Sequence, residues 1–162
     1  MAIPLFTVAG HLPAGRHVTD VHEVEVRLVL PFPLSMTRPD LYSRWRSRRQ
    51  AIAALVPSFS QEWLSGSFAS AKRDPGDVDV VTFIQRADIE ALDGDDRARL
   101  LDLVTGSAAK LRFGTHGFIC PVADDADPQR AAYLKARGYW DEFWSYTKTG
   151  DERGYLDVRG EP

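Results

Sequence analysis

The sequence predicts an α/β fold in which a small mixed β-sheet is flanked by helices. Runs rich in β-branched residues, such as 77–84, alternate along the chain with segments of helical periodicity, such as 39–55. The 162 residues match the size of one ordinary domain, and 44% of them are hydrophobic. Because no repeat, low-complexity tract or long linker divides the chain, we expect a single domain over residues 1–162.

Two helices are expected in the first third of the chain. Residues 10–15 are loop-like, and a short helix is predicted over about 20–28, because Thr19 and Glu23 fit an approximate helix start. A second helix is predicted over 39–55, where apolar residues recur at helical spacing until a proline ends the pattern.

Two strands are expected next, joined by a polar turn. Residues 59–65 alternate in the manner of a strand, and residues 77–84 have high β-branched content. Pro75 and Gly76, just before the second of these, are typical of a turn.

The second half of the chain predicts a helix, a strand, a helix and a strand. The first helix is expected over 95–112 and the strand over 118–122. The next helix should open near 128 and be closed by Gly138, and the last strand is expected over 154–158.

Composition and residue spacing argue against several classes of protein and site. A net charge of −3 argues against a uniformly basic nucleic-acid binder, although a local basic patch is compatible with it. The single cysteine, Cys120, excludes an intramolecular disulfide, and its apolar strand predicts an inert core residue. With no signal-peptide pattern and no run near ~18 apolar residues, we expect a cytoplasmic protein without a membrane partner. The histidines have no zinc-ligand spacing, so no zinc site is expected.

The segment that carries chemistry is Gly66-Ser67 followed by Asp77-Val78-Asp79. A glycine lets the backbone approach a triphosphate closely, and Ser67 offers an amide and a hydroxyl to phosphate oxygens. Residues two apart on a strand share a face, so Asp77 and Asp79 would project together, with α-carbons about 7 Å apart. Two such carboxylates can hold magnesium against the phosphates.

Alternative interpretations of this segment are simpler. The pattern fits a surface turn followed by a half-exposed strand with two solvated aspartates. A second Gly-Ser pair, Gly106-Ser107, falls inside the predicted helix and precedes an acidic loop by too many residues. We therefore favour the phosphate and metal interpretation for the first pair alone.

The pattern Gly66-Ser67…Asp77-x-Asp79 resembles the signature of the nucleotidyltransferase superfamily, which has a DNA-polymerase-beta-like fold. Softer features elsewhere resemble a family of small bacterial proteins akin to minimal nucleotidyltransferases: Leu12-Pro13-Ala14-Gly15, the arginine-rich helix, and Tyr139-Trp140-Asp141-Glu142-Phe143. The resemblance implies a Mg²⁺-dependent enzyme that moves a nucleoside monophosphate from a nucleoside triphosphate, with ATP expected, to a macromolecular acceptor. That acceptor would be a protein or a tRNA, in a toxin–antitoxin or phage-defence system.

One departure from the superfamily pattern concerns the third carboxylate, which usually comes from a neighbouring strand and acts on the incoming hydroxyl. His116 stands where it is expected, and Asp124 lies at the far end of that strand. Histidine exchanges protons near neutral pH, so His116 is a candidate catalytic base, with a structural role as the alternative. A degenerate nucleotidyltransferase that binds a nucleotide or a partner protein and regulates it is the competing function.

Other features have both functional and structural interpretations. Lys72 and Arg73 lie between Ser67 and Asp77 and are candidates for phosphate binding, although loops are often basic for solubility. The arginines of the helix over 39–55 could steer a triphosphate or tRNA, but a solvated helix face is favoured: Arg44, Arg46, Arg48 and Arg49. The late aromatic group could stack a base, but core packing is favoured: Tyr139, Trp140, Phe143, Trp144 and Tyr146.

Overall fold

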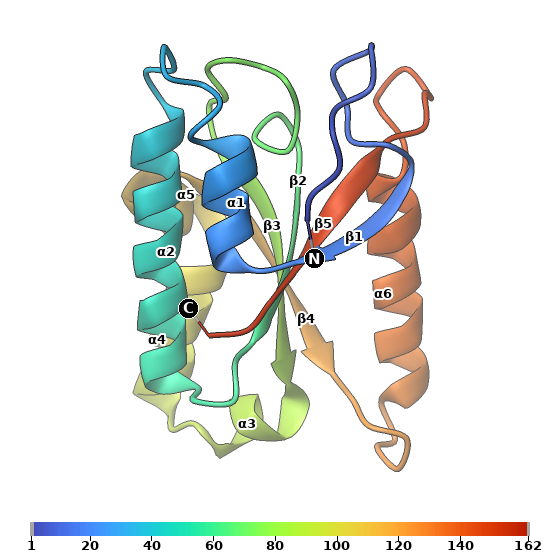
Figure 1. Cartoon of the computed structure of the whole chain (residues 1–162). Helices are drawn as coiled ribbons and strands as arrows, with labels where there is room; N and C mark the ends of the chain where they lie inside the picture. The colour runs from blue at the N-terminus through green and yellow to red at the C-terminus, as the bar shows by residue number, and fades with distance from the viewer. Residues whose placement is uncertain (1, 162) are drawn as a thin grey trace.

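The protein forms a five-stranded mixed sheet with helices on both faces, in a computed structural model that describes residues 2–161 (Figure 1). The strand order is β1-β5-β2-β3-β4, with β1 parallel to β5, β3 parallel to β4, and β2 antiparallel to both of its neighbours. The predicted α/β fold is therefore confirmed. The strands are β1 (Gly15–Thr19), β2 (Gln61–Ser65), β3 (Val78–Gln85), β4 (Thr115–Val122) and β5 (Gly154–Arg159).

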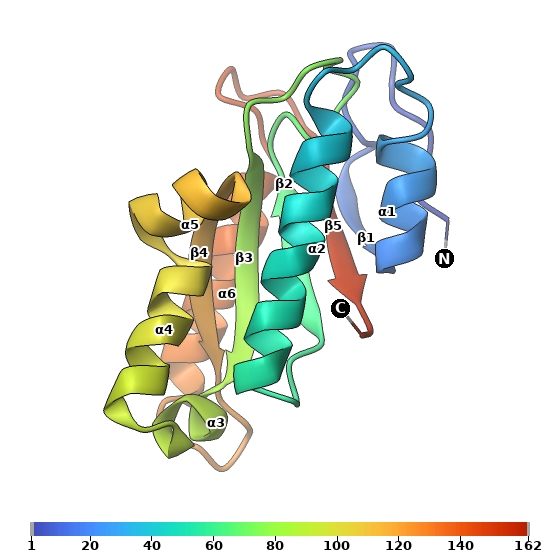
Figure 2. The same ribbon diagram turned by 90° about the vertical axis from the view of Figure 1, so that its left-hand side faces the viewer.

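The helices divide unequally between the two faces of the sheet. Helices α1, α2, α4 and α5 cover one face, and α6 lies on the other (Figures 1 and 2). No helix within residues 2–161 combines the length and apolar character needed to cross a bilayer. The helices are α1 (Val21–Leu28), α2 (Arg38–Leu55), α3 (Arg86–Ala91), α4 (Gly94–Val104), α5 (Gly106–Phe113) and α6 (Arg130–Trp144).

The side chains of β3 alternate between the two faces of the sheet, so the strand contributes to the core on both sides. Val80 packs in a buried cluster with Trp45 of α2, whereas Val81 and Phe83 point to the other face and pack with Trp144 of α6. Since side chains alternate along a strand, Asp79 shares the α6 face with Val81 and Phe83. The predicted strand over 77–84 is thus buried on both faces along most of its length, and Asp79 lies at its less buried start.

A buried ion network under α2 corrects the prediction of a solvated helix face for two of its four arginines, whereas Arg44 and Arg46 stay partly exposed. Arg48 and Arg49 are fully buried, and both pair with the buried carboxylate of Glu62 on β2. Trp45 Nε1 donates to the same carboxylate at 2.9 Å. Burial alone would raise the pKa of Glu62, but the charges and hydrogen bonds of its partners hold that pKa below the ordinary value. The arginines face the sheet because this strand presents an acid to them.

Two other boundaries differ from the sequence expectation. The helix predicted over 95–112 is divided into α4 and α5, because Thr105 is extended and Gly106 has a φ of +76°. Gly138 does not end its helix: α6 continues to Trp144, which packs against Trp63 and Tyr155 in the core. Strand β1 and helix α3 were not predicted. Both are short, so the sequence pattern in each is brief.

Candidate functional site

The residues singled out from the sequence meet at one end of the sheet. Gly66 and Ser67 directly follow β2, and Asp79 lies opposite Ser65 in the antiparallel ladder. Asp79 in turn lies beside His116 in the parallel β3–β4 pair. The end of β2 and the starts of β3 and β4 therefore lie side by side.

Gly66 makes the closest approach in this group. Its φ is +74°, and a Cβ added there would lie 1.8 Å from Oδ2 of Asp79. A larger residue would clash with that carboxylate and would also be strained, because side-chain-bearing residues rarely adopt this conformation. From the sequence, we expected Gly66 to let the backbone approach a triphosphate closely. In the structure, the same property lets the turn close over Asp79.

Ser67 leaves two donors without a protein partner. Within the described chain, neither its amide nor its hydroxyl donates a hydrogen bond to another group, although its carbonyl accepts from Ser70 Oγ at 2.8 Å. The neighbouring Ser65 hydroxyl is buried and also lacks a partner among residues 2–161. Buried polar groups are normally satisfied by protein, water or ligand. The end of β2 thus has unused hydrogen-bonding capacity beside Asp79.

Both aspartates have nitrogen-bearing partners. His116 Nδ1 lies 3.0 Å from Asp79 Oδ1, and Lys110 Nζ lies 2.8 Å from Asp77 Oδ2. The two carboxylates are partly accessible, with 24% of the Asp77 side chain and 28% of the Asp79 side chain exposed. The hydrogen bond and charge of Asp77 raise the pKa of Lys110 above its ordinary value. Lys110 was not singled out from the sequence, because nothing in α5 marks one lysine as facing β3.

Arg153 adds a second positive charge, besides Lys110, near this end of the sheet. Burial lowers the pKa of Arg153, and the charge of Asp79 partly opposes that effect. Its Nε donates to the Trp144 carbonyl at 3.2 Å, which ties the segment before β5 to the end of α6. Arg153 lies 74 positions after Asp79 in the chain, so local sequence patterns give no indication of their proximity.

Arg38 fixes the loop that follows Ser67. Its buried guanidinium donates to the carbonyl oxygens of Phe68, Ser70 and Lys72 at 2.8, 2.6 and 2.6 Å. It also donates to the Leu28 carbonyl at 2.7 Å, at the end of α1. Burial lowers the pKa of Arg38 to about 10, and the charge of Asp74 partly opposes this. Neutral carbonyls, rather than a carboxylate, therefore hold this cation and shape the loop.

A groove of about 670 Å³ opens beside the site, along the outer edge of β4. Lys110 and His116 line it, together with Phe118 and Trp140, whose ring centroids are 4.4 Å apart. The two residues that contact Asp77 and Asp79 thus also border a space large enough for part of a ligand.

Other candidates lie apart from this group. Lys72 and Arg73 are exposed. Within residues 2–161, neither side chain makes a hydrogen bond or ion pair with Ser67, Asp77 or Asp79, and Arg73 instead pairs with Asp74. Asp124 lies beyond the far end of β4, where it accepts from the amides of Ala126 and Asp127.

The aromatic group on α6 and just after it is divided between core and surface. Trp144 is buried and Trp140 is partly buried, as core packing predicts. Tyr139, Phe143 and Tyr146 are about half exposed, so the packing interpretation is wrong for these three.

The donor set fits magnesium better than a metal held wholly by protein. Among residues 2–161, no three His, Cys, Asp or Glu side chains converge as a metal site. Magnesium is commonly held by one or two carboxylates together with phosphate oxygens. Asp77 and Asp79, beside the free donors of Ser67, match that chemistry.

Comparison with known proteins identifies a family. The chain matches a family of unknown function (DUF6932) over residues 4–159. No curated protein and no solved structure matches it.

Proposed function

This chain belongs to the DUF6932 family, and we propose that it is a magnesium-dependent nucleotidyltransferase. It would transfer a nucleoside monophosphate from a nucleoside triphosphate, with ATP as the expected donor, to a hydroxyl of a protein or an RNA. One observation carries the proposal. The Gly66 turn closes over the Asp79 carboxylate, so the free amide and hydroxyl of Ser67 lie on the turn beside a potential metal ligand.

The chain's own residues divide the work. The Ser67 amide and hydroxyl would bind phosphate oxygens, and Asp77 and Asp79 would hold the metal. Bound magnesium supplies positive charge that neutralises the phosphates. Lys110, which pairs with Asp77, would meet the negative charge of the departing pyrophosphate.

His116 is the proposed base. A hydrogen bond from Nδ1–H to Asp79 would leave Nε2 free to accept a proton from the acceptor hydroxyl. The acceptor oxygen then bonds to the α-phosphorus as the bond to the pyrophosphate oxygen breaks. Asp79 would thereby orient the base as well as hold the metal.

A degenerate nucleotidyltransferase that binds and regulates without turnover is the second candidate. The observation that favours it is that His116 occupies the place of the third carboxylate, while Lys110 already neutralises Asp77. Magnesium would have to compete with Lys110 for Asp77 and with the His116 ring for Asp79.

A transfer assay distinguishes these functions. Purified protein is incubated with magnesium and each α-labelled nucleoside triphosphate, in the presence of bulk tRNA or cell lysate. Under the proposed function, label enters an RNA or a protein, and Asp77→Asn combined with Asp79→Asn removes it without unfolding the protein. Magnesium-dependent binding without labelling supports the regulatory candidate. If the double variant binds nucleotide as well as the wild type does, the metal assignment is wrong.

A further inference from the structure

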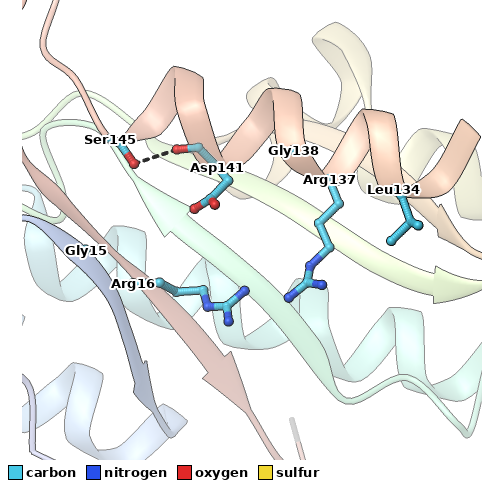
Figure 3. A pocket seen from close by; sticks show the side chains of 7 residues that line it. All are labelled: Gly15, Arg16, Leu134, Arg137, Gly138, Asp141 and Ser145. Atoms are coloured by element: carbon cyan, nitrogen blue, oxygen red, sulfur yellow. Dashed lines mark hydrogen bonds between the residues drawn. The ribbon is translucent and has the colours of Figure 1, made fainter. Parts of the chain in front are cut away.

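A second groove, of about 610 Å³, lies between α6 and the edge strand β1, at the opposite edge of the sheet from β4. Figure 3 shows Arg16 of β1 and Arg137 of α6 reaching toward each other over the sheet. Arg16 lies three strands from Asp79, or about 14 Å at ordinary strand spacing. This groove is therefore separate from the site around Asp79, and the proposed function does not use it.

The charges in the groove are only partly balanced. The Arg137 guanidinium makes no hydrogen bond or ion pair with any residue from 2 to 161, and the Arg16 guanidinium has one ionic contact, 3.7 Å from Asp157. That acid is already bound by Arg159 at 2.8 Å. Asp141, the other nearby carboxylate, accepts a hydrogen bond from the Tyr155 hydroxyl. Both nearby carboxylates are therefore engaged by other groups, and the Arg137 guanidinium, which has no ionic partner among residues 2–161, points into the groove.

Arg16 and Arg137 both lie over the same aromatic ring, that of Trp63. Their guanidinium carbons lie 5.4 and 5.8 Å from the ring centroid of Trp63, which is fully buried on β2. A guanidinium held over a ring keeps its edge N–H groups available for a forked contact with an oxyanion. Trp63 Nε1 is itself buried and has no acceptor in the part of the chain that the structure describes. An unsatisfied buried donor is unusual and is consistent with a missing acceptor.

The walls of the groove leave room for a ligand. A Cβ placed on Gly15 or on Gly138, which line opposite walls, would meet no atom within 4 Å. Asp141 borders the same space, and its carboxylate could accept hydrogen bonds from hydroxyl groups.

We infer that this groove binds a phosphate monoester whose organic part carries hydroxyl groups. Arg16 and Arg137 hold the phosphate dianion in a forked contact, and Asp141 accepts from a ligand hydroxyl. A long polyanion such as RNA fits less well, because Asp141 and Asp157 flank the arginines and the chain carries a net charge of −3.

The test is an NMR titration of the intact protein without magnesium, following the indole N–H signals of its four tryptophans. The probes are inorganic phosphate and glycerol phosphate. We expect saturable binding of both, with glycerol phosphate the tighter. Arg16→Gln and Arg137→Gln should each weaken binding roughly tenfold, as expected for loss of a charge-assisted hydrogen bond.

Matched variants keep the test decisive. Arg99→Gln removes an equal charge from the surface of α4 and should leave the affinity unchanged. Gly138→Glu keeps both arginines but adds a carboxylate to the groove wall, and should abolish binding. Ser67→Ala should have no effect, which separates this site from the proposed transferase site. Equal phosphate affinity in wild type and the Arg16→Gln/Arg137→Gln double variant would overturn the inference. Tighter binding of a short RNA, with steep salt dependence, would also overturn it.

Discussion

The substitution Gly66→Ala tests the contact on which the proposed site depends. The new methyl group would lie 1.8 Å from Oδ2 and 2.8 Å from Cγ of Asp79, so the carboxylate would have to move. The backbone φ of +74° adds strain of roughly 1–2 kcal/mol for alanine. Displacing Asp79 from its contact with His116, together with the crowding around the new methyl group, adds about 1–3 kcal/mol. Most of this comes from the crowding, because the contact is partly exposed and contributes little alone.

Gly106→Ala is the matched control. Its φ of +76° is nearly the same, but a Cβ there meets nothing within 4 Å, so it reports backbone strain without the collision. We expect urea unfolding to show Gly66→Ala as less stable than Gly106→Ala by about 1–3 kcal/mol. Asp79→Ala should remove most of that difference when combined with Gly66→Ala, because the colliding oxygen is then absent. Nucleotide binding should be lost in Gly66→Ala even at temperatures where the variant is fully folded.

Equal free energies of unfolding for the two glycine variants would refute the reasoning. The turn would then not be packed against Asp79, and the juxtaposition of Ser67 with the carboxylates would lose its physical basis. If the destabilisation of the Gly66→Ala/Asp79→Ala double variant equalled the sum of the two single effects, the same conclusion would follow, because the two residues would then not be coupled.

Three further predictions concern stability and reactivity. Glu62→Gln should destabilise the fold by about 3–5 kcal/mol in urea unfolding, because it leaves two buried arginines without their carboxylate. The control Glu90→Gln, which removes an exposed ion pair, should cost under about 1 kcal/mol. Because the pKa of Glu62 is lowered in the folded state, its ion pairs stabilise the fold above the ordinary glutamate range. That stabilisation should be lost as the pH falls through the lower folded value, and the Gln variant should lack this dependence. Burial raises the pKa of Cys120 to about 11, so a thiol reagent should modify the native protein roughly a hundredfold more slowly than the urea-unfolded chain; equal rates would contradict its burial. Gly138→Ala should stabilise α6 by about 0.5–1 kcal/mol, because the position is helical and open, and a lower melting temperature would contradict this.

Periodicity predicted the long elements because burial there follows the local pattern. Helix α2 and strand β3 lie close to their expected ranges. Periodicity failed where a partner distant in sequence decides burial. By local pattern, Arg48 and Arg49 belong to the exposed face of a helix. They are buried because they pair with Glu62 on the following strand. Gly138 has the composition of a helix end, but the aromatic side chains that follow it pack on the sheet and extend α6.

In the candidate site, too, local sequence patterns identified some residues and could not identify others. The order of Gly66 and Asp79 in the chain placed them at the ends of two consecutive predicted strands, and consecutive strands commonly lie side by side, as β2 and β3 do. Lys110, Arg153 and Arg38 could not be found that way. Each approaches the site from a different element, and a lysine or arginine on a helix or loop has the same local pattern whether it faces water or a carboxylate.

The Arg38 guanidinium has a consequence for folding cooperativity. It joins the last turn of α1, through the Leu28 carbonyl, to the loop between Phe68 and Lys72. Opening of either segment would expose a buried cation that has no carboxylate partner, so the two should open together. Amide hydrogen exchange in α1 and around the Gly66 turn should therefore proceed at matched rates. A protease that removed the first thirty or so residues would then disorder the proposed phosphate-binding loop without cutting it.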